Sequence, residues 1–509
     1  AASSCVGRVR RIRTGFFPED PDYIDPERPL FAERFGSKWR HMDDPALQAP
    51  VLERSNVGMG MIVLNQPAGL DLPAINTAYT KLRNLEVNTL KRFVGFTARD
   101  TQPSEYSIES RREKGQLSQI VMPFCDGIHP RELLLAAAAC ARKGQLPRFS
   151  RALLWHNQEL AHLIADYRKP FVCHLSGSAR NSGAALACLA NFSGACEASE
   201  ISVDACSMGL VPDGGMTFVL GKLPWHLGEF LAMTGRKVRG ADLVYCNLIK
   251  HWMSPEALPF LELTAEKQLE VSETDARALL DEHSLPLPDG AFQDLQSDSV
   301  SRIHLPLIDS VFQAGSVQAI SIELKKLKTD GNSDVRIFAE DCLRRMSRAC
   351  PLALSGTLAL IRDARQNLKK GASLERALKL ELRVQQRLLD RSDAIVGLHA
   401  RCVGREVPMD KWTNQIGGII QDDVDDLLRE PDLVLGGLED FVIAPRSEVS
   451  LSQHPRLRRY HPDYDPVTKT DHDPAWMAAE VRRWSPDFLA KERLIAIDEL
   501  LDGADPSMY

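Results

Sequence analysis

Residues 169–190 of the chain have the sequence KPFVCHLSGSARNSGAALACLA, and this stretch decides the fold. Its first part, residues 169–177, carries an apolar run that ends in a Ser-Gly turn, which predicts a buried strand. Small residues then occupy positions 182–190 and permit a closely packed helix. A strand, a turn and a helix in this order are typical of α/β proteins built from crossover units.

The same alternation continues on both sides of this stretch. Upstream, apolar periods of two and of 3.6 predict strands at 57–63, 92–96 and 120–124 and helices at 72–85, 130–141 and 153–167. Downstream, residues 334–428 carry long helical periods. We therefore expect an α/β core that is followed by a helical part.

Changes in texture divide the chain into four parts. Each end lacks a regular apolar period and is rich in Pro and Arg, which predicts extended arms. The parts are a basic, irregular arm at 1–56, an α/β core at 57–333 with a polar insertion near 101–119, a helical part at 334–430, and a C-terminal extension at 431–509.

Composition excludes several classes of protein. The 509 residues hold 62 Lys and Arg against 69 Asp and Glu, a formal charge of −7, which argues against a protein that coats nucleic acid on all sides but leaves room for one basic patch. Eleven cysteines without a Cys-x-x-Cys pair favour buried free thiols in a reducing compartment over disulfides or a metal site. No apolar run approaches the roughly 18–20 residues of a membrane span.

The first thirteen residues carry four arginines and no acidic residue. An arginine-bearing, acid-poor start resembles the end of a mitochondrial targeting segment, so we expect a mitochondrial location, in the matrix. The alternative is a basic arm left after processing, or an artificial start.

Three motifs in a fixed order resemble the crotonase superfamily, specifically its 3-hydroxyisobutyryl-CoA hydrolase branch. Lys169-Pro170 through Gly183 is similar to the family's Lys-Pro strand and three-glycine turn. MGLVPDGG, residues 208–215, is similar to its G-L-F-P-D-x-G-G, and residues 231–242 to its L-A-L-T-G and G-x-D pair. The resemblance covers roughly residues 58–428. It implies the crotonase (ClpP-like) fold of repeated ββα units with a helical C-terminal part.

The same resemblance implies that the catalytic carboxylates are missing. The family's main glutamate lies four residues before the glycine of G-L-F-P-D, and here that position is Ala205. A second glutamate lies twelve residues before the Lys-Pro pair, where this chain has Asn157. Only the aspartate of the Pro-Asp pair is retained, as Asp213. Thioester hydrolysis needs a carboxylate within reach of the attacking or departing group, so we expect no hydrolase activity.

The groups that should bind the thioester oxygen are also altered. Such enzymes polarise the carbonyl with two backbone N–H groups. By the resemblance one comes from the middle of the three-glycine turn, where Ser182 keeps the N–H but adds a side chain. The other comes from a segment in which Asp126 places a carboxylate beside a site for negative charge. CoA binding is therefore doubtful, and we expect no cofactor.

Neighbouring groups offer little rescue. Asp204 precedes Ala205, but adjacent side chains of an extended segment point to opposite faces. His156 could act as a base, although a packed or surface histidine is the more common role. Cys206 lacks a visible histidine partner, which favours a buried thiol.

A chain that keeps a fold without its catalytic groups has binding as its most economical role. It is similar to the catalytically degenerate branch member found in the small subunit of mitochondrial ribosomes. We expect a structural ribosomal subunit that contacts the small-subunit ribosomal RNA and neighbouring proteins. The candidate RNA contacts lie in the two arms: Arg8, Arg10, Arg11, Arg13, Arg456, Arg458 and Arg459.

Three alternatives stay open. The chain could be an active acyl-CoA thioester hydrolase or hydratase of valine or fatty-acid catabolism that uses rearranged residues. It could instead be a non-ribosomal pseudoenzyme that partners an active crotonase. The arms could also be solvated tails that pack on their own domain.

Overall fold

The computed structural model describes residues 50–429 apart from a set of gaps. The gaps are 56–57, 66–68, 89, 99–122, 144–147, 176, 255–256, 258–277, 279–280, 288–304 and 369–373. The expected insertion near 101–119, the C-terminal extension and all seven arm arginines lie outside the described residues.

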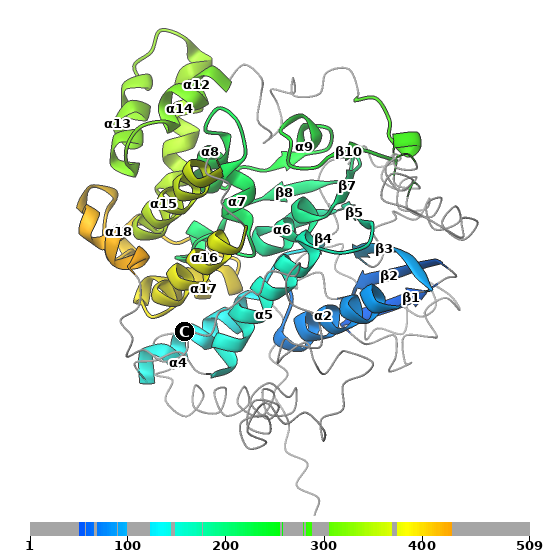
Figure 1. Cartoon of the computed structure of the whole chain (residues 1–509). Helices are drawn as coiled ribbons and strands as arrows, with labels where there is room; N and C mark the ends of the chain where they lie inside the picture. The colour runs from blue at the N-terminus through cyan, green and yellow to red at the C-terminus, as the bar shows by residue number, and fades with distance from the viewer. Residues whose placement is uncertain are drawn as a thin grey trace, which may run out of the picture.

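A six-stranded sheet forms the centre of the core, in the order β1-β2-β3-β5-β7-β10 (Figure 1). Its strands are β1 (Val51–Ser55), β2 (Gly58–Leu64), β3 (Lys91–Ala98), β5 (Phe171–Leu175), β7 (Phe192–Ala195) and β10 (His251–Trp252). All neighbours are parallel except β1, which runs antiparallel to β2. The strands β2 and β5 are buried along their whole length, as is usual for parallel sheets covered on both faces.

The pairing of β1 shortens the expected N-terminal arm, which we placed at 1–56. Val51 lies opposite Leu64 and Ser55 opposite Gly60, so these five residues form an edge strand of the core. The five residues VLERS are too few to show a regular alternation of apolar and polar residues. Their strand conformation depends on pairing with β2, which local sequence does not reveal.

A second sheet of four short strands has the order β4-β6-β8-β9. The strands are β4 (Pro123–Cys125), β6 (Ser178–Arg180), β8 (Glu200–Ser202) and β9 (Val238–Arg239). Along the chain, β3, β5 and β7 of the large sheet are each followed by β4, β6 or β8 of the small sheet. A helix follows β4 and β6 directly, which confirms the predicted repeated ββα units.

Helices cover both sheets and form the C-terminal part. Those of the core are α2 (Leu72–Val87), α4 (Pro130–Lys143), α5 (Arg148–Ala165), α6 (Asn181–Leu189), α7 (Met216–Gly221), α8 (Leu227–Thr234) and α9 (Asp242–Tyr245), with the 3₁₀ helix η2 (Ala205–Met208). The later ones are α12 (Leu305–Phe312), α13 (Val317–Leu327), α14 (Ser333–Met346), α15 (Pro351–Leu368), α16 (Leu374–Leu389), α17 (Ser392–Cys402) and α18 (Gln421–Leu428), with η4 (Met409–Lys411) and η5 (Ile416–Gly418).

We expected the helical part to begin at residue 334, but its first helix, α12, already begins at Leu305. The ring of Phe230 on α8 lies 5.3 Å from that of Phe312 on α12 and 5.9 Å from that of Phe338 on α14. These three buried rings join the helices on either side of the expected boundary into one unit with the core.

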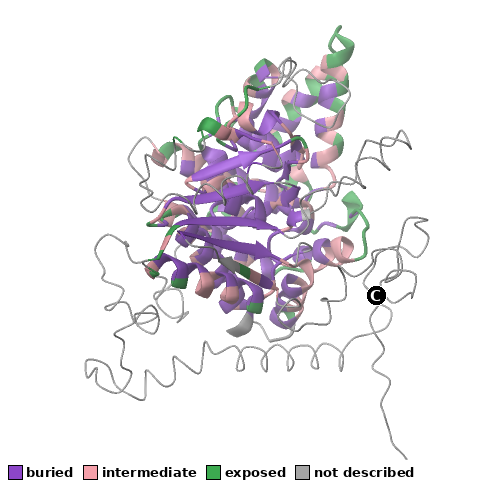
Figure 2. Ribbon diagram, turned by 90° about the vertical axis from the view of Figure 1, so that its right-hand side faces the viewer, coloured by how far each residue is buried: buried purple, intermediate pink, exposed green. Residues whose placement is uncertain are grey.

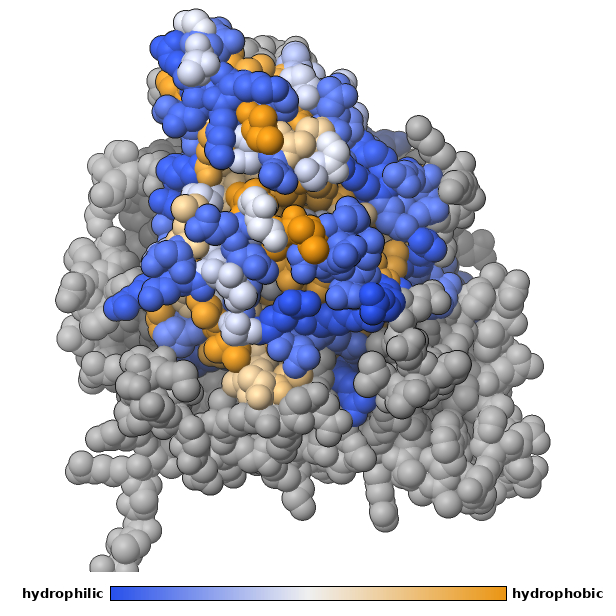
Figure 3. Space-filling view, turned by 90° about the vertical axis from the view of Figure 1, so that its left-hand side faces the viewer, coloured by the Kyte–Doolittle hydropathy of each residue, from blue (hydrophilic) through white to orange (hydrophobic). Residues whose placement is uncertain are grey.

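The burial pattern follows these layers. Figure 2 shows both sheets buried, with the exposed residues gathered on the outer helices and loops. Figure 3 shows that polar and charged residues cover most of the face formed by the C-terminal helices, with smaller apolar areas between them. Among the described residues, no helix combines the length and apolarity that a membrane crossing requires.

The close approach of α17 to η2 depends on Gly397. A Cβ added there would lie 2.4 Å from the carbonyl carbon of Met208 and 2.6 Å from its oxygen, and backbone cannot give way as a flexible side chain can. We expect Gly397→Ala to lower the free energy of unfolding by about 1–3 kcal/mol through overpacking, despite the better helix propensity of alanine. Urea denaturation followed by circular dichroism measures this.

Gly417→Ala is the matched control. Gly417 is exposed, and its added Cβ would meet nothing within 4 Å. Its change should stay within about 0.5 kcal/mol. Equal stability of the two variants would show that α17 can move away from η2 at little cost.

Candidate functional site

Three residues singled out in the sequence lie together inside the core. Asn157 lies on α5, Ser182 in the first turn of α6, and Asp213 in the loop before α7. The amide Nδ2 of Asn157 donates to Oδ2 of Asp213 at 3.1 Å. A Cβ on Gly214 would lie 2.8 Å from the Cβ of Ser182 and 3.6 Å from Nδ2 of Asn157. The fold therefore converges at the position where the resemblance places an active site.

The two segments that the resemblance assigns to oxyanion donors also lie against each other. A Cβ on Gly183 would lie 2.2 Å from the carbonyl oxygen of Cys125 and 2.7 Å from the nitrogen of Gly127. Gly127 has a φ of +81°, and its own Cβ would lie 2.6 Å from Oγ of Ser182. The backbones approach so closely that positions 127 and 183 require glycine. A side chain is accommodated at the neighbouring position, Ser182.

The site is enclosed by protein. All four residues at the expected site positions are buried: Asn157 and Ser182 are 1% exposed, Ala205 is 2% exposed and Asp213 is 5% exposed. Ala205 belongs to the main apolar core. These four side chains are therefore packed inside the protein.

Burial raises the pKa of Asp213 to about 7. The N–H and hydroxyl of Ser182 act in the opposite direction and lower it, but their effect is smaller. The Asp213 carboxyl therefore lies beside the N–H that the resemblance assigns to the substrate oxygen. An acidic group of the chain itself faces that donor.

A buried carboxylate on α16, Glu381, holds the loop that carries Asp213. It accepts hydrogen bonds from the N–H of Gly215 at 2.7 Å and from the N–H and hydroxyl of Thr217 at 2.9 and 2.5 Å. One turn later on α16, Gln385 accepts from the N–H of Val211 at 3.2 Å. Burial raises the pKa of Glu381 to about 8, against the effect of these donors.

We did not single out Glu381 from the sequence. The available signal was its position on the apolar face of a helix, beside Leu378 and Leu382, where a charged side chain needs a buried partner. The partner could not be read locally, since Thr217 lies 164 residues earlier.

Asp126 lies in a separate charged cluster. Its carboxylate is 3.5 Å from Nε of Arg180, and Arg180 and Arg401 both contact Asp204, at 3.3 and 3.2 Å. Burial raises the pKa of Asp126, and the two arginines partly offset this. The carboxylate that we expected beside the oxyanion site is therefore paired with an arginine of the neighbouring strand.

We predicted an extended segment at Asp204 and Ala205, and this prediction is wrong. Ala205–Met208 is the 3₁₀ helix η2, and Asp204 precedes it. Burial raises the pKa of Asp204, but Arg401 and Arg180 outweigh it and hold the pKa below its ordinary value. Asp204 also accepts from Asn181 at 3.0 Å. These contacts commit the carboxylate to a structural role.

The other rescue candidates are occupied as well. His156 is buried, with its Nδ1 3.0 Å from a carboxylate oxygen of Glu159 on the same helix. The thiol of Cys206 lies 3.2 Å from the hydroxyl of Thr357, and burial raises its pKa to about 12. Within the described part of the chain, no group of three His, Cys, Asp or Glu side chains could hold a metal ion.

The chain belongs to the enoyl-CoA hydratase/isomerase family, whose model matches residues 122–428. This confirms the resemblance to the crotonase superfamily. The chain is similar to mitochondrial 3-hydroxyisobutyryl-CoA hydrolases: 25% identical to that of Danio rerio over 389 residues, 76% of this chain and 91% of that protein. Against the hydrolase of Xenopus tropicalis it is 28% identical over 266 residues, 52% of this chain and 64% of that protein.

A ribosomal protein is also among its relatives. The chain is 26% identical to the small ribosomal subunit protein mS47 of Arabidopsis thaliana over 258 residues, which are 50% of this chain and 59% of that protein. It thus spans less than two thirds of the length of the plant and frog relatives.

Solved structures confirm the fold. A carnitinyl-CoA dehydratase from Mycobacterium thermoresistibile matches with a TM-score of 0.58 at 20% identity, over 75% of this chain and 97% of that one. An enoyl-CoA hydratase from Rhodobacter sphaeroides matches with a TM-score of 0.56 at 24% identity, over 74% of this chain and 97% of that one.

The raised pKa of Asp213 predicts a pH dependence of stability. Asp213 moves from its ordinary 3.8 to about 7 on folding, so between these values the folded chain holds a proton that the unfolded chain releases. The free energy of unfolding should therefore fall as pH rises through this window, by up to about 1.4 kcal/mol per pH unit. Asp213→Asn should remove this contribution, since an amide does not ionise and its oxygen still accepts from Asn157.

Urea denaturation in buffers between pH 4.5 and 8 gives the free energy of unfolding as a function of pH for the natural chain and for Asp213→Asn. The two slopes should differ by the equivalent of roughly one proton. A residual slope of the same sign should remain, because Glu381 is raised to about 8. Asp410→Asn, at an exposed position, controls for simple loss of charge. Parallel slopes in the Asp213 variant and the natural chain would show that Asp213 is ionised in the folded protein.

Proposed function

We propose that the chain is a catalytically inactive member of the hydrolase branch that serves as a structural component of the mitochondrial ribosome small subunit, in the matrix. One observation carries the inactivity: a buried hydrogen bond between Asn157 and Asp213 occupies the place of the expected carboxylate chemistry.

The side chains at the expected catalytic positions support this proposal. An amide at 157 cannot accept a proton as a carboxylate does, and Ala205 offers no polar atom. Asp213 is the retained acid, but its Oδ2 accepts from Asn157 and its carboxyl lies beside the N–H of Ser182. A group held in this way stabilises the loop rather than activating water.

The ribosomal role rests on similarity and on charge. One relative is a small ribosomal subunit protein, and the hydrolase relatives are mitochondrial. Both arms carry arginines without a regular apolar period, a composition that suits contact with RNA phosphates. We propose the small-subunit ribosomal RNA and adjacent ribosomal proteins as partners.

An active acyl-CoA thioester hydrolase or hydratase is the second candidate. The match that spans 91% of a mitochondrial hydrolase favours it, together with the retained Asp213. A pseudoenzyme that partners an active crotonase would share the degenerate site but would not associate with ribosomes.

The inactive site predicts that the purified chain does not turn over 3-hydroxyisobutyryl-CoA. Loss of one acid–base group typically costs about 10²–10⁴-fold, and here two are replaced. Release of free CoA, followed with a thiol reagent, gives the rate against the mitochondrial hydrolase as positive control. Turnover near that of the hydrolase and its loss in Asp213→Ala would establish the second candidate.

The ribosomal role predicts that the full chain sediments with mitochondrial small subunits. Changing Arg456, Arg458 and Arg459 to Ala should weaken this association, and its dependence on salt should become shallower by about one unit per lost phosphate contact. Sedimentation across a salt series measures both effects.

The control variant removes the same charge from the folded part of the chain. It changes three exposed lysines at the end of α13 to alanine: Lys325, Lys326 and Lys328. It should sediment like the natural chain. Equal weakening of both triple variants would assign the effect to net charge, and absence of the natural chain from the particles would reject the ribosomal role.

A further inference from the structure

A pocket of about 250 Å³ opens between helices of the core and helices of the C-terminal part. It is bounded by η2, the ends of α8 and α14, the helix α17 and the loop 403–407. None of Asn157, Ser182 and Asp213 lines it. Asp204 and Cys206, which flank Ala205, do line it, so the pocket lies beside the Ala205 position and not at the contact of Asn157 with Asp213.

The lining combines an apolar surface with arginines. Its apolar members are Cys206, Ala232, Met233, Ala349 and Val407, and its charged members are Arg345, Arg348, Arg401, Arg405, Asp204 and Glu406. Four guanidinium groups against two carboxylates give the lining a net positive charge. Such a pocket suits an anion that also has an apolar part.

Two of the arginines are committed to internal carboxylates. Arg401 contacts Asp204, which Arg180 and Asn181 also hold, and Arg345 donates to Asp341 at 2.8 Å. Asp204 and Asp341 are at most one fifth exposed, so these pairs belong to the packed structure.

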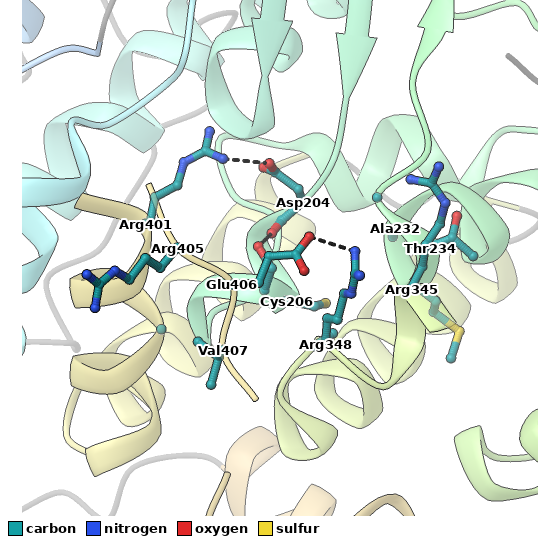
Figure 4. Close-up of a pocket in the computed structure, with 15 residues that line it drawn as sticks. Asp204, Cys206, Ala232, Thr234, Arg345, Arg348, Arg401, Arg405, Glu406 and Val407 are labelled. Carbon is teal, nitrogen blue, oxygen red and sulfur yellow. Dashed lines mark hydrogen bonds and ion pairs between the residues drawn. The ribbon is translucent and has the colours of Figure 1, made fainter. Parts of the chain in front are cut away.

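Arg348 is held differently. Its partner is Glu406, with the two groups 2.6 Å apart, and the side chains are 41% and 65% exposed. In Figure 4 the carboxylate of Glu406 is turned toward Arg348, whereas Arg405 points away from the other arginines. An exposed pair of this kind contributes little to stability, so another carboxylate can replace Glu406 at low cost.

We propose that this pocket binds a small organic carboxylate with a short apolar body. The carboxylate would take the place of Glu406 on Arg348, and the body would lie against the apolar lining. The ion pair with Glu406 shows that a carboxylate fits against the guanidinium of Arg348. An inorganic anion would make no apolar contact with the lining, whereas an organic carboxylate would. The proposal goes beyond the ribosomal role, since it needs neither RNA nor catalysis.

Titration calorimetry on the full chain tests this with three probes at constant ionic strength: hexanoate, the neutral hexanamide and inorganic phosphate. Hexanoate should bind saturably and more tightly than either of the others, because it alone has both the charge and the apolar body. Phosphate binding as tight as that of hexanoate would overturn the assignment to an organic acid. Equal binding of hexanamide would remove Arg348 from the proposal.

Three single variants locate the contact. Arg348→Gln should weaken hexanoate by about tenfold or more, the usual effect of losing a charge-assisted hydrogen bond. Glu406→Gln should tighten it by up to about fivefold, because the resident competitor is removed. Arg391→Gln is the matched control for charge, since Arg391 is exposed and does not line the pocket, and it should change affinity by less than about twofold.

Thermal unfolding of each variant confirms that it is folded before titration. An Arg391→Gln effect as large as that of Arg348→Gln would show attraction by net charge rather than a site. Failure of hexanoate to bind both the natural chain and Glu406→Gln would overturn the proposal. Neither result bears on sedimentation with ribosomes, so the two proposals fail independently.

Discussion

The carboxylate of Glu381, wholly inside the protein, joins the helical part to the α/β core. It satisfies three donors at the start of α7, and Gln385 one turn away satisfies a fourth at Val211. Without it, the N–H groups of Gly215 and Thr217 would be buried without an acceptor, which is more costly than the loss of an ordinary hydrogen bond. The conformation of the loop 209–215 depends on this contact, and with it the place of Asp213.

Asn157 stands where the resemblance places a carboxylate, and an amide has a structural advantage there. Two carboxyl groups in one enclosed site oppose each other's ionisation, and each raises the other's pKa. Asn157 instead donates to Asp213 and gives the retained acid a neutral partner. Asn157 thus contributes a buried hydrogen bond, and Ala205 is part of the apolar core.

Local pattern was enough to predict most of the fold. The strand and helix within residues 169–190 appear as β5 and α6, and the ββα repeat followed from the family's motifs. What could not be predicted depends on partners far apart in the chain. The sequence near Asp126 suggested a charge beside the oxyanion donors, but Arg180 engages that charge. The 3₁₀ turn at Ala205 was hidden because small residues permit several backbone conformations.

The antiparallel edge strand β1 has a mechanical consequence. Val51 lies opposite Leu64, at the end where the parallel strands finish, and among the described strands β1 has β2 as its one neighbour in the sheet. A pull on the chain that precedes Val51 would load the hydrogen bonds of β1 one at a time, from Val51 toward Ser55, rather than all together. Edge strands open at lower free energy than central ones. The strand can therefore separate and pair again while β2, β3 and β5 stay in register, so the core tolerates a pull at Val51.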